Sequence, residues 1–107
     1  MALFMMSEKD ETSIQVAAGK PFAIRLRASP GTGYRWDLAA ELDKGLLEFL
    51  DEKTEETADT RLGGSEFVVW TFRALAAGET VIAMKYARPW ETSAAPARTH
   101  GFKVKIL

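Results

Sequence analysis

The chain has 107 residues and a mass of 11.8 kDa, the size of one ordinary domain, and a second domain is excluded. Its 14 Lys and Arg against 15 Asp and Glu leave a net charge of −1, which gives no basic field for nucleic acid or anionic lipid, so neither is expected as a partner. The absence of Cys excludes a thiol nucleophile, a disulfide framework and a thiolate metal site.

The N-terminal run MALFMM is apolar, but it is too short for the core of a signal peptide and is followed at once by polar residues. No export signal is therefore visible, although a removed leader is compatible with this start, and the compartment stays open. No apolar run approaches the roughly 20 residues that cross a bilayer. We expect a flexible segment at 1–11 and a single monomeric domain at 12–107, with no cofactor and no metal.

Apolar residues recur at every second position from Ser13 onward, which is the period of strands with one buried face, whereas helical spacing is almost absent. One helical turn is expected at 39–44, ended by Gly45. The predicted strands lie at 12–16, 21–28, 34–38, 46–51, 66–75 and 80–87, and a last one contains Phe102, Val104 and Ile106.

Short strands at this spacing, with Gly and Pro in the connections, favour an all-β fold, an immunoglobulin-like antiparallel β-sandwich of about seven to eight strands. A closed barrel is the structural alternative. The segment 66–75 is apolar on both faces, so we expect it to be a central strand. Inward or core positions are predicted at Ile14, Val16, Trp36, Leu47, Phe49 and Trp70. One face each is shared by Phe22, Ile24 and Leu26; by Tyr34, Trp36 and Leu38; by Val68, Trp70 and Phe72; and by Ile82, Met84 and Tyr86.

Three unusual connections are predicted to share one end of the sandwich. If consecutive strands run antiparallel, the chain changes ends at each connection, so every second connection falls at the same end. These are residues 29–33, with two glycines, and the long stretches 52–64 and 88–99. Long loops in compact domains are usually functional or disordered, and a rigid β scaffold holding several together is typical of binding domains. The sequence therefore predicts recognition at that end.

Each loop feature also has a plain structural interpretation. Residues 29–33 are followed by a strand and not by a helix, which disfavours a phosphate cradle and favours a tight turn or a protein contact. Gly63 and Gly64 are consistent with a bulge or hinge. The acidic run at 51–59 lacks the spacing of a calcium loop and is interpreted as solvated.

Single aromatic and titratable residues give little support for catalysis. Trp36 and Trp70 lie in alternating strands and are expected in the core, whereas Trp90 is equally consistent with packing on the core and with exposure. His100 is the only histidine, which excludes a two-histidine metal site. No nucleophile motif accompanies it, so we expect no enzyme.

Three segments together resemble the chagasin-like family of protein inhibitors of papain-type cysteine peptidases. The family's first loop reads Asn-Pro-Thr-Thr-Gly before an aromatic residue, and this chain has Ser29, Pro30, Gly31, Thr32, Gly33 and Tyr34, continued by Arg35 and Trp36. The second is a glycine-rich pattern before a strand that ends in Phe, Lys or Arg, and Ala; here it is Arg61, Leu62, Gly63 and Gly64, then Phe72, Arg73 and Ala74. The third, Arg-Pro-Trp, is intact as Arg88, Pro89 and Trp90.

The resemblance covers about residue 14 to the C-terminus and implies an immunoglobulin-like inhibitor that occludes a peptidase cleft reversibly with three loops. It places residues 30–33 nearest the catalytic Cys and His of the enzyme. It assigns main-chain pairing in the unprimed cleft to Gly63 and Gly64, and an apolar contact on the primed side to Trp90, supported by Arg88 and Pro89. The implied partner is a papain-like cysteine peptidase.

Two departures from the family pattern are expected to alter the strength or the selectivity of inhibition. Gly31 stands where the family commonly has a Thr side chain, and Arg61 stands at the first glycine of the second loop. Ser29 replaces Asn but is still able to bond its own backbone. The competing interpretation is a non-inhibitory immunoglobulin-like adhesion or ligand-binding module that uses Trp90 to contact a sugar or another protein.

Overall fold

The computed structural model describes residues 11–29, 31–56, 66–91 and 95–107. Within these ranges the chain forms seven strands and no helix, so none of the described residues belongs to a helix that could cross a membrane. The strands are β1 (Glu11–Val16), β2 (Pro21–Ala28), β3 (Arg35–Leu38), β4 (Leu47–Glu56), β5 (Glu66–Ala74), β6 (Gly78–Ala87) and β7 (Arg98–Ile106).

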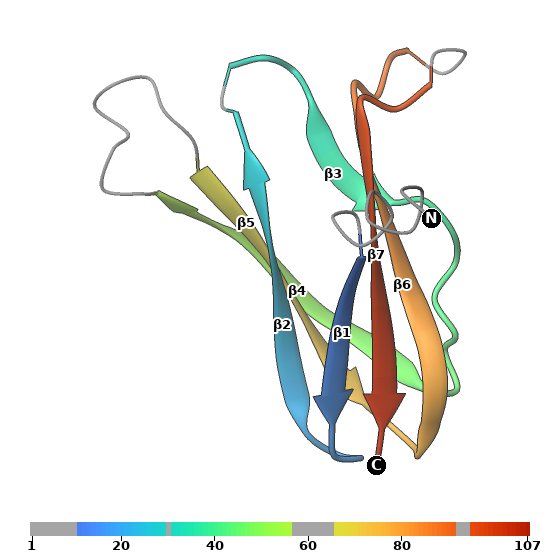
Figure 1. Ribbon diagram of the computed structural model, residues 1–107. Coiled ribbons are helices and arrows are strands. Elements are labelled where there is room, and N and C mark those ends of the chain that lie inside the picture. The colour runs from blue at the N-terminus through green and yellow to red at the C-terminus, as the bar shows by residue number, and fades with distance from the viewer. Residues whose placement is uncertain (1–10, 30, 57–65, 92–94) are drawn as a thin grey trace, which may run out of the picture.

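The strands form two sheets, β1-β7-β6-β3 and β2-β5-β4, which face each other as a sandwich (Figure 1). Neighbouring strands are antiparallel except for β1, which runs parallel to β7. Each sheet keeps two free edges, so the sandwich is confirmed and the closed barrel is wrong. β5 lies between β2 and β4, which confirms it as a central strand.

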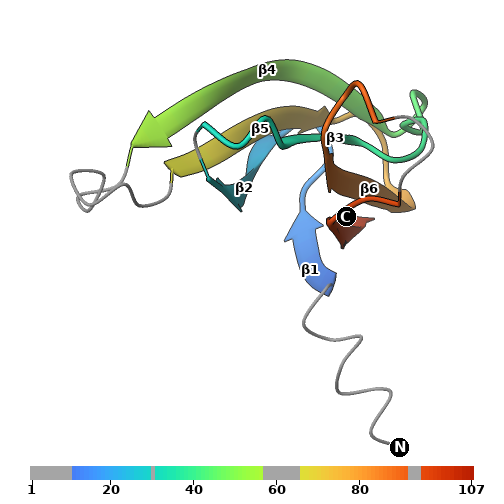
Figure 2. The ribbon, with the colours of Figure 1, turned by 90° about the horizontal axis from the view of Figure 1, so that it is seen from above.

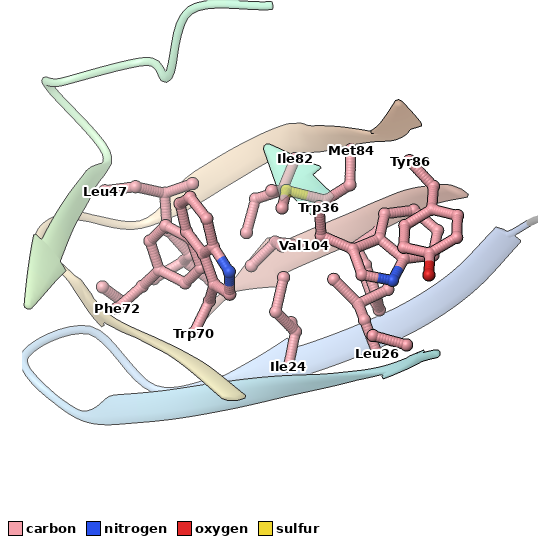
Figure 3. Packing of buried hydrophobic residues seen from close by; sticks show 14 residues of the cluster. Ile24, Leu26, Trp36, Leu47, Trp70, Phe72, Ile82, Met84, Tyr86 and Val104 are labelled. Carbon is pink, nitrogen blue, oxygen red and sulfur yellow. The ribbon is translucent and has the colours of Figure 1, made fainter. Parts of the chain in front are cut away.

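The core lies between the sheets and is built from the alternating positions of the strands (Figure 3). Phe72, Ile82 and Met84 have no exposed surface, and Trp36 and Trp70 are buried, as the sequence predicted. Because successive residues of a strand point to opposite faces, Lys103 and Lys105 remain in solvent while the residues between and beside them are buried. The buried residues are Ile24, Leu26, Ala28, Trp36, Leu47, Val69, Trp70, Phe72, Ala74, Ile82, Met84, Tyr86, Phe102, Val104 and Ile106.

One expected core residue is exposed, whereas several other inward positions are partly buried. Phe49 faces the same side of its sheet as Phe72 and contacts both Trp70 and Phe72, with ring centroids 5.1 and 5.8 Å apart, yet it is 44% exposed. The prediction of full burial was wrong because β4 is an edge strand, where the inward face has neighbours on one side only.

Two expectations around β4 are corrected. The strand was expected to end at Asp51, but β4 runs to Glu56 and pairs with β5 up to Glu66, because a solvent-facing edge strand continues its ladder without burying polar side chains. The helical turn expected at 39–44 does not form. Instead the carbonyl of Asp43 accepts hydrogen bonds from the amides of Leu46 and Leu47, both at 2.9 Å, while its carboxylate accepts one from Gly45 at 3.0 Å. This local carboxylate bond fixes a turn directly before β4.

Smaller differences concern strand ends, where local patterns are weak. β1 starts at Glu11, one residue inside the expected N-terminal segment, and β3 starts at Arg35. β5 ends one residue early, at Ala74. β6 and β7 begin at Gly78 and Arg98, so the third unusual connection is shorter than expected. Pairing with β7 extends both strands beyond their apolar runs.

The two buried tryptophans give a matched test of one hydrogen bond. The indole N–H of Trp36 donates to the carbonyl of Arg27 at 2.9 Å, whereas that of Trp70 is buried without a partner in the structure as described. Trp36→Phe leaves a carbonyl unpaired, but Trp70→Phe removes an unsatisfied donor. We expect Trp36→Phe to lower the free energy of unfolding by about 1 kcal/mol more than Trp70→Phe in denaturant titrations. Equal losses would contradict this assignment.

Candidate functional site

The three unusual connections leave the sandwich at one end. β2, β4 and β6 run toward this end and β3, β5 and β7 run away from it, which confirms the direction argument made from the sequence (Figure 1). Seen from above, residues 31–34 lie between the end of β4 on one side and the segment after β6 on the other (Figure 2). We call this surface the loop end.

We call the connection between β2 and β3, residues 29–34, the middle loop. Its base is held by side chains from the opposite sheet. Ser29 follows β2, and its amide donates to the hydroxyl of Tyr86 on β6 at 2.9 Å. Two residues earlier, the carbonyl of Arg27 accepts the bond from Trp36 on β3. Both bonds cross from sheet β1-β7-β6-β3 to β2, so they fix the last residues of β2 relative to the other sheet.

The same side chains form an aromatic stack beneath the loop. Tyr86 lies between Tyr34 and Trp36, with ring centroids at 5.3 Å and 5.0 Å. The guanidinium of Arg98 lies 5.6 Å from the Trp36 ring. Aromatic pairs of this kind contribute about 0.5–1.5 kcal/mol each beyond the area they bury. The middle loop therefore stands on a rigid base.

The side chain of Thr32 forms hydrogen bonds within the middle loop. Its hydroxyl donates to the carbonyl of Ser29 at 2.9 Å and accepts a bond from the amide of Tyr34 at 3.3 Å. Both bonds are local, and they hold the loop in a turn. The hydroxyl of Thr32 is consequently already engaged within the loop.

Arg88 joins the middle loop to the third loop, which is the connection between β6 and β7. Its Nε donates to the carbonyl of Thr32 at 3.2 Å, and its guanidinium carbon lies 4.5 Å from the centre of the Tyr34 ring. The other side of the guanidinium faces Glu91, at 3.7 Å between Nη1 and Oε2, and the amide of Glu91 donates to the carbonyl of Arg88. One side chain thus sets the spacing of two loops.

Trp90 lies on the middle loop and not on the core. A Cβ placed on Gly33 would be 2.5 Å from Cη2 of Trp90, so the ring lies directly against the Gly33 main chain. Gly33 also has a φ of +84°, which L side chains rarely adopt. Trp90 nevertheless keeps 68% of its surface exposed. Of the two interpretations left open by the sequence, exposure is confirmed, with the indole held at a fixed place.

Gly31 has the backbone conformation of Gly33 but a different environment. Its φ is +81°, and nothing lies within 4 Å of the position where a Cβ would be. A β-branched residue such as Thr is strained at this φ. The glycine is therefore matched to the shape of this loop.

Several predicted site residues lie outside the described residues: Pro30, Arg61, Leu62, Gly63 and Gly64. The last described pair before the second loop is Glu56 opposite Glu66, at the loop end. Of the predicted residues, the structure brings together Ser29, Thr32, Gly33, Arg88 and Trp90 by direct contact. Tyr86 was assigned only to the core, because no sequence pattern reveals a hydroxyl partner 57 residues away.

His100 takes part in a contact between strands. Its Nε2 lies 2.8 Å from the hydroxyl oxygen of Thr12, which joins β7 to β1, and its ring packs against Phe102 with a centroid distance of 4.5 Å. In the part of the chain that the structure describes, no group of three or more His, Cys, Asp or Glu is placed to hold a metal ion.

An immunoglobulin-like domain with three connections at one end is an arrangement typical of binding domains, and comparison with known proteins defines its class. The model of the chagasin family of peptidase inhibitors, I42, matches residues 15–106. This chain belongs to that family, so it is a peptidase inhibitor and not an enzyme.

Individual relatives agree with this assignment. Amoebiasin-2 of Entamoeba histolytica is 28% identical over 106 residues, covering 98% of this chain and 86% of that protein. The crystal structure of the cysteine protease inhibitor EhICP2 of the same organism superposes with a TM-score of 0.77 at 24% identity, over 94% and 90% of the two chains. PbICP-C, solved in complex with falcipain-2, has a TM-score of 0.66 at 19% identity, over 91% and 89%. These two structures support the fold.

The two glycines of the middle loop test the contact with Trp90. Gly33→Ala and Gly31→Ala incur the same strain from positive φ, about 1–2 kcal/mol, but only Gly33→Ala collides with the indole. We expect Gly33→Ala to displace Trp90 into solvent and to increase quenching of tryptophan fluorescence by acrylamide, because Trp36 and Trp70 are buried. Gly31→Ala should leave quenching unchanged. Identical quenching in both variants would show that Trp90 does not rest on Gly33.

Tyr86→Phe tests the bond that holds the base of the loop. The change removes one hydroxyl and leaves the ring stack in place. We expect a loss of about 1 kcal/mol in stability, the typical net value of a hydrogen bond. We also expect faster amide hydrogen exchange at Ser29, measured by NMR. An unchanged exchange rate at Ser29, with other amides as internal controls, would contradict the bond.

Proposed function

We propose that this protein inhibits papain-like cysteine peptidases reversibly, by filling the active-site cleft with the three loops of its loop end. The inhibitory unit is the single domain at 12–107. The observation that carries the proposal is Trp90, a largely exposed indole that is held on Gly33 beside the middle loop. A large aromatic side chain in a fixed position is a typical anchor of a protein interface.

The proposed contacts follow the order of the loops across the loop end. Ser29, Pro30, Gly31, Thr32 and Gly33 enter nearest the catalytic Cys and His of the enzyme. Leu62, Gly63 and Gly64 approach on the unprimed side, where main-chain pairing tolerates many related peptidases. Arg88, Pro89 and Trp90 contact an apolar surface on the primed side.

Rigidity supports tight binding without a conformational change. The bonds of Thr32, the guanidinium of Arg88 and the hydroxyl of Tyr86 order the middle loop in the free protein. Side chains and loops that are already ordered do not lose that entropy again on binding. Because the hydroxyl of Thr32 bonds within its own loop, the enzyme meets a turn in which this hydroxyl is already engaged and position 31 carries no side chain.

The structure of PbICP-C, which was solved in complex with falcipain-2, supports the choice of partner. The direct experiment is titration of the purified protein into papain and into a cathepsin L-like enzyme, with a fluorogenic peptide as substrate and a serine peptidase as the control. We expect dose-dependent, reversible inhibition of the cysteine enzymes alone. Inhibition of none of them at micromolar protein would contradict the proposal and favour a non-inhibitory binding module.

Trp90→Ala is expected to weaken inhibition at least tenfold, about 1.4 kcal/mol or more, because an anchor of this type typically contributes 2 kcal/mol or more. Leu75→Ala is the matched control, since Leu75 is also an exposed apolar residue but lies at the opposite end of the sandwich. Both variants should keep the melting temperature of the parent. An inhibition constant that is the same for Trp90→Ala and the parent would exclude Trp90 from the interface.

A further inference from the structure

A group of basic side chains lies on the outer face of the β2-β5-β4 sheet next to the loop end. In the row nearest the loops, Arg27, Phe67 and Glu55 stand side by side across the three strands. The next row holds Arg25, Val69 and Lys53. These two rows carry three cations and one anion, although the whole chain has a net charge of −1. We call Arg25, Arg27 and Lys53 the basic patch.

Two of the cations are held over one ring. The guanidinium carbons of Arg25 and Arg27 lie 4.3 and 5.4 Å from the centre of Phe67. Arg25 also pairs with Glu55 at 3.2 Å. Among the described residues, neither Arg27 nor Lys53 has a carboxylate within the 4 Å of an ion pair. The patch therefore presents positive charge that only Glu55 pairs with among the described residues.

The rest of this outer face differs from the basic patch in its charged residues. At its far end Arg73 lies 3.9 Å from Glu48 and donates to the carbonyl of Gly19 at 3.2 Å, and Asp51 stands in the row between. The acidic residues Glu52 and Glu66 belong to the opposite face, because side chains alternate along each strand. Among the described residues of this face, positive charge without an ion pair is thus concentrated beside the loops.

The position of the patch fits a contact that accompanies docking of the loops. Arg27 is two residues from Ser29, about 7 Å along the strand. The connections after β2, β4 and β6 together have about the 20–30 residues that one side of a standard protein interface uses, so the adjoining strand surface lies at the rim of such an interface. Three cations on a chain of negative net charge are too few for the phosphate contacts that sustain nucleic-acid binding, which favours a protein partner.

We propose that the basic patch docks against carboxylates on the surface of the target peptidase, at the unprimed rim of its cleft, and speeds association by electrostatic attraction. This inference rests on the proposed function and extends it from the loops to the adjoining sheet face. Complementary charge at the edge of an interface acts mainly on the association rate and is screened by salt. The patch therefore favours peptidases with an acidic rim over otherwise similar enzymes.

The test compares two double variants that lose the same charge. Arg27→Gln with Lys53→Gln removes the two cations of the patch that have no ion pair with another described residue, and it leaves the ion pair of Arg25 in place. Lys44→Gln with Lys105→Gln removes two exposed lysines outside the patch and outside the loop end. Association and dissociation rates are measured by surface plasmon resonance with a cathepsin L-like peptidase of negative net charge, at several salt concentrations.

We expect the patch variant to associate about five- to tenfold more slowly than the parent at low salt and less than twofold more slowly at about 0.5 M salt, with dissociation nearly unchanged. The control variant should associate as the parent does. Equal association of patch variant and parent, or an equal loss in the control, overturns the inference while leaving the loop mechanism intact. A parent protein that does not bind the peptidase overturns the proposed function and this inference together.

Discussion

The loop end depends on the way the two sheets are joined beneath the middle loop. Tyr86 and Trp36 belong to one sheet, yet the hydroxyl of Tyr86 bonds Ser29, directly after β2 in the other sheet, and the indole N–H of Trp36 bonds Arg27 in β2. Both bonds are partly buried, and their two side chains belong to one aromatic stack with Tyr34. Because packed aromatic rings resist displacement, the loop inherits the rigidity of the core. The stability of the domain and the position of the middle loop therefore depend on the same three side chains, those of Tyr34, Trp36 and Tyr86.

From this base the arrangement of the loops follows step by step. Tyr34 supports the guanidinium of Arg88, and Arg88 in turn bonds the carbonyl of Thr32, so the third loop is attached to the middle one. Gly33 leaves the space in which the Trp90 ring lies. The result is a protruding surface with an exposed indole on a stiff turn. Such a surface loses little entropy on binding, which suits an inhibitor that must fill a cleft without being rearranged by it.

The sequence predicted the architecture well because it is encoded locally. Period-two alternation in segments such as 21–28 and 102–106 identified strands and their buried faces, and the direction argument placed three loops at one end. Prediction from the sequence failed where neighbouring strands decide whether a residue is buried or where a strand ends. Phe49 has the residue type and register of a core position but lies on an edge strand, and β4 continues through polar residues because β5 offers a ladder. Neither fact is visible in a single segment.

The features of the site also fall into those that the sequence predicts and those that only the tertiary structure sets. The residue types of Ser29, Thr32, Gly33, Arg88 and Trp90, and their order along the chain, were readable from the sequence, since turn glycines and an Arg-Pro-Trp segment have recognisable patterns. Only the tertiary structure decided that Trp90 rests on Gly33, that Arg88 spans two loops, and that Arg25 and Arg27 share the ring of Phe67. The reason is physical: each of these contacts joins residues tens of positions apart, and their distances are set by the packing of two sheets.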